Sequence, residues 1–232
     1  MAARRPISER RNHSPSKSEV GERTRAQLLS AGARLFAFKG FAATSVRELT
    51  AAAACNVAAV SYHFGSKLGL YHELFRRLLK SMREERIASV AKVVASRGAA
   101  LEVEDILEAF ARAWMAPFTE EGEGEVRVLL LAREMTDPQL ASEDFLKEMA
   151  EPVRDSLARA ISAVLPGLPR RRLQLCVHSF IGQLVHLLRI RSMPWSSDRA
   201  RFNTFETDEL LTHIIDFTAG GIRRFADMRE RT

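Results

Sequence analysis

The chain has 232 residues and a mass of 26.0 kDa, and 46% of its residues are hydrophobic and 28% charged, the balance of a folded protein with a sizeable core. This composition excludes disorder throughout the chain, and no apolar run reaches the ~18 residues that a membrane span needs. Because residues 1–20 are rich in Arg and Ser and have no apolar core like that of a signal peptide, we expect a cytoplasmic protein.

The positive charge is concentrated at the N-terminal end. Residues 1–67 carry 11 basic and 4 acidic side chains, a net charge of +7, whereas the remainder carries 24 basic and 25 acidic side chains. Lys and Arg neutralise phosphates and supply the sequence-independent part of nucleic-acid affinity. The distribution therefore favours a polyanionic partner for the N-terminal part, although a basic tail that only aids solubility is the alternative for the first 17 residues.

Residues 1–20 contain almost no side chains to bury, so we expect a flexible basic arm. Thr24 and Gln27 have the spacing of a capping box, which predicts a first helix over 24–39 that ends at Gly40. A second capping box pairs Ser45 with Glu48, although Thr44 is an alternative cap for the same helix.

Asn56 is predicted to cap the start of a third short helix that ends at Gly65, with Val60 and Phe64 on its buried side. Only three or four residues around Ala54 separate it from the helix before. Two short helices at this spacing are typical of a helix-turn-helix.

Helical periodicity continues to the C-terminus, and no segment alternates like a strand. The expected fold is all-α with about nine helices, the later ones over 67–95, 102–117, 125–136, 142–164, 169–192 and 206–228. We divide the chain into the arm (1–20), a helix-turn-helix domain (21–67) and a C-terminal helical domain (68–232).

The last two helices are apolar on more than one face. A central position in a single bundle would explain the apolar faces of either helix alone. The two together favour a homodimer interface, since an obligate interface is as apolar as the core of a domain. The predicted interface residues are Phe180, Leu184, Leu188, Leu211, Ile215 and Ile222.

In a helix-turn-helix the second helix enters the major groove of DNA. Val57, Ala58 and Ser61 are small enough to approach base edges, and the Ala and Val methyls suit a thymine methyl. Tyr62, His63 and Lys67 can donate to phosphates. The full predicted DNA-binding set is Thr44, Ser45, Arg47, Asn56, Val57, Ala58, Ala59, Ser61, Tyr62, His63 and Lys67.

These residues resemble the TetR family of bacterial transcriptional regulators. The resemblance lies within Thr24 to Tyr71, in Leu35-Phe36-Ala37-Phe38-Lys39-Gly40-Phe41, Thr44-Ser45-Val46-Arg47-Glu48-Leu49 and Tyr62-His63-Phe64-Gly65-Ser66-Lys67. The third helix, starting Asn56-Val57-Ala58-Ala59, is similar to that of a subgroup with an aliphatic-Ala-Ala sequence. The resemblance implies an all-α dimer that binds DNA through its first three helices and is released by a small molecule bound in the C-terminal domain.

Two positions depart from the family pattern. Ala54 stands where the family usually has Gly, so a left-handed backbone would be strained there. Leu68 and Gly69 replace the acidic residue that usually follows the Lys. By position, the resemblance implies that Arg47 contacts a base or a phosphate.

The sequence contains no nucleotide-binding loop, zinc-protease helix or nucleophile elbow, so we expect no enzyme, cofactor or metal site. Cys55 and Cys176 are far apart and suggest neither a disulfide framework nor a zinc site. Residues that could line an effector cavity, or equally belong to the core, are Trp114, Phe118, Arg133, Met135, His178, Gln183 and His186.

We therefore expect a DNA-binding transcriptional regulator, a repressor by family default, that leaves a near-palindromic operator when a ligand binds. The alternative is a helical ligand-binding or scaffolding protein that does not read DNA. The effector, the operator, activation in place of repression and any DNA contact of the arm remain open at this stage.

Overall fold

The computed structural model describes residues 16–119, 122–140, 150–192 and 205–228. Within these ranges it contains nine α-helices, one short 3₁₀ turn and no strand, as the all-α prediction requires. The helices are α1 (Lys17–Lys39), α2 (Val46–Ala52), α3 (Ala58–Phe64), α4 (Lys67–Arg97), α5 (Val103–Thr119), α6 (Glu123–Thr136), α8 (Glu151–Val164), α9 (Arg170–Ser192) and α11 (Thr207–Asp227), and the 3₁₀ turn is Gly98–Ala100. No helix in these ranges is long and apolar enough to cross a membrane.

The first helix begins earlier than predicted. Ser16 and Glu19 form the capping box of α1, with the Ser16 backbone N–H donating to the Glu19 carboxylate. Thr24 lies inside the helix, and its hydroxyl donates to the Val20 carbonyl instead of capping the helix. The predicted start at Thr24 is thus corrected to Lys17, and the rest of the predicted arm (1–15) lies outside the described residues.

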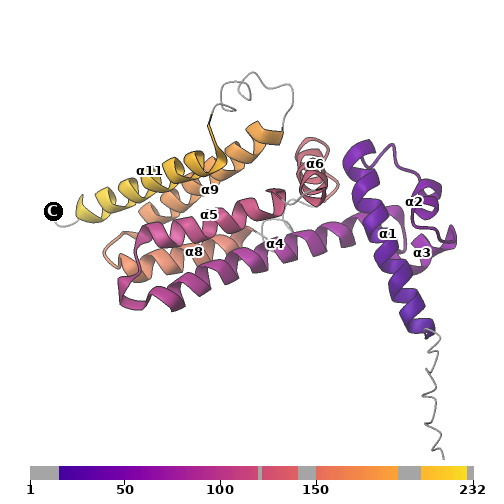
Figure 1. The fold of residues 1–232 in the computed structure, drawn as a ribbon, viewed down its shortest axis with the longest axis horizontal. Helices are drawn as coiled ribbons and strands as arrows, with labels where there is room; N and C mark the ends of the chain where they lie inside the picture. The colour runs from indigo at the N-terminus through magenta and orange to yellow at the C-terminus, as the bar shows by residue number, and fades with distance from the viewer. Residues whose placement is uncertain (1–15, 120–121, 141–149, 193–204, 229–232) are drawn as a thin grey trace, which may run out of the picture.

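The long helix α4 connects the two parts of the molecule (Figure 1). It begins directly after α3, capped by the Ser66 hydroxyl, which accepts from the Gly69 N–H. Its first three turns bury Leu70, Tyr71 and Phe75 against the N-terminal helices, and its later turns pack on α5 and α8.

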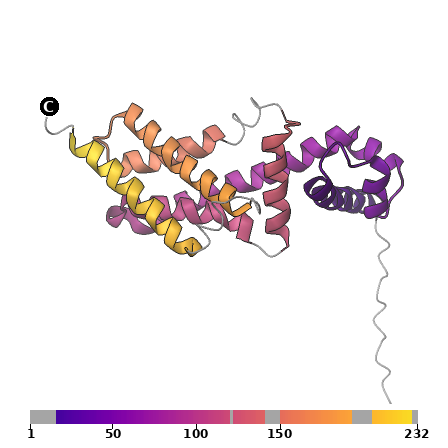
Figure 2. The ribbon, with the colours of Figure 1, turned by 90° about the horizontal axis from the view of Figure 1, so that it is seen from above.

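Helix α6 lies between the N-terminal helices and the C-terminal bundle, crossing α4 steeply in Figure 2. Its Val126 and Leu130 are part of the same apolar core as Leu28 and Leu49. The N-terminal core therefore includes residues beyond the predicted boundary at 67. A second, larger core fills the bundle of α4, α5, α8, α9 and α11.

Candidate nucleic-acid interface and effector pocket

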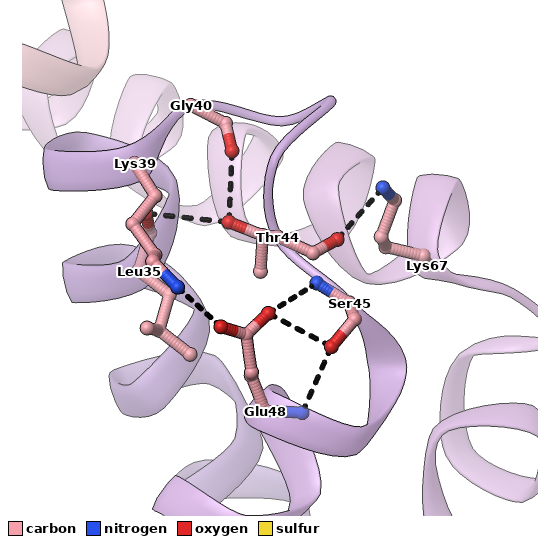
Figure 3. Close-up of polar contacts among 7 residues, drawn as sticks. All are labelled: Leu35, Lys39, Gly40, Thr44, Ser45, Glu48 and Lys67. Carbon is pink, nitrogen blue, oxygen red and sulfur yellow. Dashed lines mark hydrogen bonds and ion pairs between the residues drawn. The ribbon is translucent and has the colours of Figure 1, made fainter.

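The helix-turn-helix is held by side chains that cap α2 (Figure 3). The Glu48 N–H donates to the Ser45 hydroxyl, and the Glu48 carboxylate accepts from the Ser45 backbone N–H, as the sequence predicted. Lys39, the last residue of α1, also donates to Glu48. Chiefly because of Lys39, and then of Ser45, the pKa of Glu48 is lowered to about 2, so this link between α1 and α2 persists at neutral pH.

Two predicted DNA contacts have structural partners instead. The Thr44 side chain is buried, and its hydroxyl donates to the Gly40 carbonyl at 2.8 Å, so it has no surface to offer a phosphate. The Lys67 ammonium donates to the carbonyls of Phe41 and Thr44, at 2.8 and 2.9 Å, and lies 4.2 Å from the centre of the Phe41 ring. Lys67 thus ties the start of α4 to the loop before α2 (Figure 3). Two of its three N–H donors have backbone partners and the side chain is half-buried, so its contact with a phosphate stays a prediction.

The turn between α2 and α3 has the left-handed backbone that was anticipated. Ala54 has a φ of +50°, and it is the only non-glycine residue of the described chain with a positive φ. The Ala54 and Cys55 N–H groups donate to the Ala51 and Thr50 carbonyls, which close the end of α2. A Cβ in this conformation lies too close to the following carbonyl oxygen, so the turn stores strain.

Helix α3 buries one side and exposes the other. Val60 is buried and Phe64 packs partly against the N-terminal core, whereas Val57 is 53% and Tyr62 85% exposed. Ala58 and Ser61 are also exposed, and Ala59 and His63 lie at the margins, half-buried. The predicted outward face is therefore the one that the fold presents.

Two further predicted residues lie at the edges of this face. Arg47 is exposed on α2. Asn56 does not lie at the helix start as assigned, because α3 begins at Ala58, but its side-chain carbonyl accepts from the Ala58 N–H at 2.8 Å. Asn56 thus satisfies a first-turn donor, as the sequence suggested.

The C-terminal part contains a cavity of about 380 Å³. Three of the seven predicted effector residues, Trp114, Phe118 and Met135, line it. Its other lining residues are Phe75, Leu79, Met82, Arg86, Leu131, Glu134, Pro138, Leu140, Ala150, Val153, Arg154, Ile181, Val185 and Leu188. An apolar cavity of this size with a few polar groups is typical of a small-molecule site.

The other four predicted pocket residues lie elsewhere. His178 and His186 lie outside the cavity on α9, and the Gln183 amide faces Thr218 of α11. Arg133 points to the other side of α6, where it contacts α1. The α9 residues that do reach the cavity, Ile181, Val185 and Leu188, occupy a different face of the helix.

Sequence reasoning missed Arg86, which lies in the cavity wall and is 1% exposed. A signal was present, because Leu79, Met82, Arg86 and Val90 are spaced at three or four residues and share one buried stripe of α4. A single charged residue in an apolar stripe requires a partner. Glu134 and Arg154 were also missed, and no local pattern distinguishes them from surface charges.

Arg133 joins α6 to the last turn of α1. Its guanidinium donates to the Ala37 carbonyl at 2.6 Å and to the Phe38 carbonyl at 2.8 Å, in the last turn of α1. These carbonyls lie where a helix leaves its acceptors unpaired and where its dipole favours a cation. Gly40 leaves room for the contact, since a Cβ there would lie 3.0 Å from the Arg133 guanidinium.

A second contact links α6 to the start of α4. The Tyr71 hydroxyl donates to the Glu134 carboxylate at 2.7 Å, and that carboxylate also accepts from the backbone N–H groups of Gln139 and Leu140. Burial, and then the Glu134 carboxylate, raises the pKa of Tyr71, so the phenol stays protonated and donating. Because Glu134 lines the cavity and Val126 and Leu130 pack in the N-terminal core, α6 contacts both the cavity and that core.

The predicted dimer residues need correction. Phe180, Leu184 and Ile222 are fully buried within the subunit, Leu211 and Ile215 nearly so, and Leu188 lines the cavity. Except for Leu188, which is half-buried, these side chains have almost no surface left to bury against a second copy. The outer faces of the same two helices carry Leu175, His178, Ser179, Gly182 and His186 on α9 and His213, Phe217, Gly220 and Arg224 on α11.

Two family models match the chain. Residues 28–74 match the bacterial regulatory proteins of the tetR family, and residues 108–221 match the tetracyclin repressor-like C-terminal domain. The two matches together include the helix-turn-helix and most of the cavity-forming helices. No curated protein shows a significant match.

Solved structures share the fold. A protein of Mesorhizobium loti MAFF303099 assigned to the TetR-family regulators is 18% identical, with a TM-score of 0.63 over 92% of this chain and 98% of its own. A transcriptional regulator from Pseudomonas aeruginosa PAO1 is 17% identical, with a TM-score of 0.63 over 88% and 94%. The TetR-family regulator PfmR from Thermus thermophilus is 22% identical, with a TM-score of 0.52 over 84% and 97%. The chain therefore belongs to the TetR family of bacterial transcriptional regulators, which bind DNA and are not enzymes.

Proposed function

We propose that the protein is a cytoplasmic homodimeric repressor that leaves a near-palindromic operator when a small molecule occupies the cavity. The observation that carries the proposal is the outward face of α3, where Val57, Ala58, Ser61 and Tyr62 are exposed while the opposite side is fixed in a core. A helix presented in this way can enter the major groove.

The contacts follow from side-chain size and chemistry. Val57, Ala58 and Ser61 would lie against base edges, where small side chains allow close approach. Tyr62 and His63 would donate to phosphates, and Arg47 on α2 would reach the backbone or a base beside them. Ser45 lies exposed at the N-terminus of α2, where a phosphate is favoured.

Dimerisation would use the outer faces of α9 and α11. The outer stripe of α9 contains Gly182 and Ser179, and the outer stripe of α11 contains Gly220, so helices from two subunits can approach closely. Leu175 and Phe217 add exposed apolar surface, at 54% and 68%. Such a dimer would place two reading helices about one turn of DNA apart, roughly 34 to 36 Å or somewhat more.

Ligand control would pass through α6. A ligand in the cavity contacts Leu131, Glu134 and Met135 on one side of this helix, while Arg133 on the other side holds the end of α1. A ligand that favours a different position of α6 would shift the spacing of the two reading helices, because it binds the two states with different affinity.

Binding to the DNA that flanks the gene tests the proposal. Fluorescence anisotropy should show a higher affinity for one palindromic segment than for a scrambled one, with a steep salt dependence.

Tyr62→Ala and Arg47→Gln should each weaken binding at least about tenfold. Lys80→Gln removes a charge from an exposed site of α4 and serves as the control, with little change expected. Equal losses in Arg47→Gln and Lys80→Gln, or no preference for any segment, would contradict the proposal and favour a helical protein that does not read DNA.

A further inference from the structure

The cavity wall contains a buried charge for which the described residues supply no hydrogen-bonding partner. Arg86 is 1% exposed, and its Nε and Nη1 atoms are fully buried and make no hydrogen bond. The guanidinium carbon lies 3.6 Å from the centre of the Trp114 ring, so the guanidinium group lies over the indole face. The ring supplies a cation–π contact but accepts no in-plane N–H, so these donors of Arg86 stay unsatisfied.

Among the residues that the structure describes, the charged groups around Arg86 do not neutralise it. Glu134 lines the cavity, but its carboxylate is already bound by the Tyr71 hydroxyl and two backbone N–H groups. Glu85 is exposed on the same helix, and its attraction only partly offsets the burial that lowers the pKa of Arg86 to about 9. Arg154, the remaining charged residue of the described cavity wall, is also a cation.

A buried cation that lacks an anion destabilises the folded protein, since water has been removed from it and nothing replaces that water. An anionic ligand would supply the missing counter-charge, because hydrogen bonds between a guanidinium and a carboxylate are charge-assisted and therefore strong. The other lining residues are almost all apolar, including Phe75, Met82 and Val185, so the rest of the ligand must be apolar as well.

We infer that the cavity binds an apolar organic anion whose single carboxylate pairs with Arg86 over the Trp114 ring, while its hydrocarbon body fills the space between α4, α5, α6, α8 and α9. A volume of about 380 Å³ has room for roughly 13 to 19 carbon atoms at about 20 to 30 Å³ each, so a body of about ten carbon atoms or more fits. The inference rests on the proposed function, because it names the chemical class of the effector.

Calorimetry on the full chain without DNA tests the inference. The probes are decanoate and 2-naphthoate, each paired with the alcohol of the same skeleton, and decylammonium. Each acid should bind at least about tenfold more tightly than its alcohol, since a charge-assisted pair forms in a dry site, and decylammonium should bind worst. If neither acid binds, or if acid and alcohol bind alike, the inference is wrong.

Substitutions distinguish the contribution of the Arg86 guanidinium to ligand affinity from that of the other residues that line the cavity. Arg86→Met roughly keeps the length of the side chain and removes the charge. The ratio of acid affinity to alcohol affinity should therefore fall to about one, while the affinity for the alcohols should change by no more than about threefold. The unliganded variant should unfold at a higher temperature, because the buried charge is gone. Arg86→Lys retains a cation and should keep part of the preference. Lys80→Met removes a charge from an exposed position of the same helix and should leave the preference unchanged.

A higher unfolding temperature together with a retained acid preference in Arg86→Met would overturn the pairing. If Arg86→Met does not fold, Arg86→Lys and the acid–alcohol comparison on the unmodified chain decide the question. DNA binding is measured separately and without ligand. Operator binding without a preference for acids would contradict only this inference. A preference for acids without DNA binding would contradict the proposed function.

Discussion

Gly69 and Ala54, on either side of α3, differ in whether their backbone has room for a Cβ. Gly69, in the first turn of α4, lies so close to the end of α3 that a Cβ would be 2.1 Å from the Phe64 carbonyl oxygen. The acidic side chain that the family often has in this region would therefore clash there. At Ala54 the situation is reversed, because a residue with a Cβ occupies a left-handed turn that suits Gly.

Ala54→Gly should stabilise the protein. Removing the Cβ relieves a left-handed conformation that costs about 1–2 kcal/mol, and the greater freedom of Gly in the unfolded chain offsets part of this gain. We expect a net gain of about 0.5–1 kcal/mol, or a rise of ~1–4 °C in the unfolding temperature.

Calorimetric melting of the unmodified and substituted proteins measures the gain. Ala51→Gly is the matched control, since Ala51 is exposed inside α2 and the same substitution should there cost about 1 kcal/mol. Shifts of the same sign in both variants would show that Ala54 is not strained.

Residue-level patterns predicted local contacts better than distant ones. The Ser45–Glu48 capping box forms as predicted, because both partners lie within one turn. The same spacing at Thr24 and Gln27 forms no cap, since α1 continues through Gly21 back to Lys17, where Ser16 and Glu19 form the capping box instead. The role of Lys67 depends on carbonyls 23 and 26 residues away, and no local pattern shows them.

At the scale of elements, α6 is the helix that both halves of the molecule share. Its apolar residues Val126 and Leu130 are in the N-terminal core, its Leu131 and Met135 line the cavity, and its Arg133 holds the end of α1. The sequence predicted the helix within two residues at its start and correctly at its end, but not its position between the two parts. Periodicity gives the apolar side of a helix and not the identity of its neighbours.

Arg133→Met should uncouple the cavity from the DNA-binding helices. It removes the two hydrogen bonds to the last turn of α1, so a movement of α6 would no longer be transmitted to that helix. Ligand binding without DNA should change by no more than about twofold. The ligand-induced drop in operator affinity, typically about 5- to 150-fold for coupled sites, should shrink toward one.

Operator binding with and without ligand, followed by anisotropy, measures the drop. Arg34→Gln is the control, because it removes an exposed contact of 3.7 Å between α1 and Glu123 of α6, and exposed pairs contribute little. Full release of DNA by ligand in the Arg133 variant would mean that coupling takes another route, such as Tyr71 and Glu134.

For the whole molecule, the sequence showed that α9 and α11 are apolar on several sides but not which side belongs to the subunit. Phe180, Leu184 and Ile222 are all used in the C-terminal core. The outer faces retain small and mixed residues with a few large apolar ones, and Phe217 on α11 is the largest of them. The hydropathy of each helix therefore predicted how much of its surface is buried. Which of its residues pack in the subunit core and which remain for an interface could be told only from the fold.

Phe217→Glu should convert the proposed dimer into a monomer. An exposed phenyl ring at the centre of an interface would be replaced by a carboxylate, and two such carboxylates would meet near the two-fold axis without a partner. Light scattering at micromolar concentration should give about twice 26.0 kDa for the unmodified chain and the monomer mass for the variant. Operator affinity should fall with it, since one subunit contacts only one half-site.

Phe38→Glu makes the same exchange at an exposed position of α1 and should leave the dimer mass unchanged. A Phe217→Glu protein that keeps the dimer mass would place the interface on another surface of the molecule.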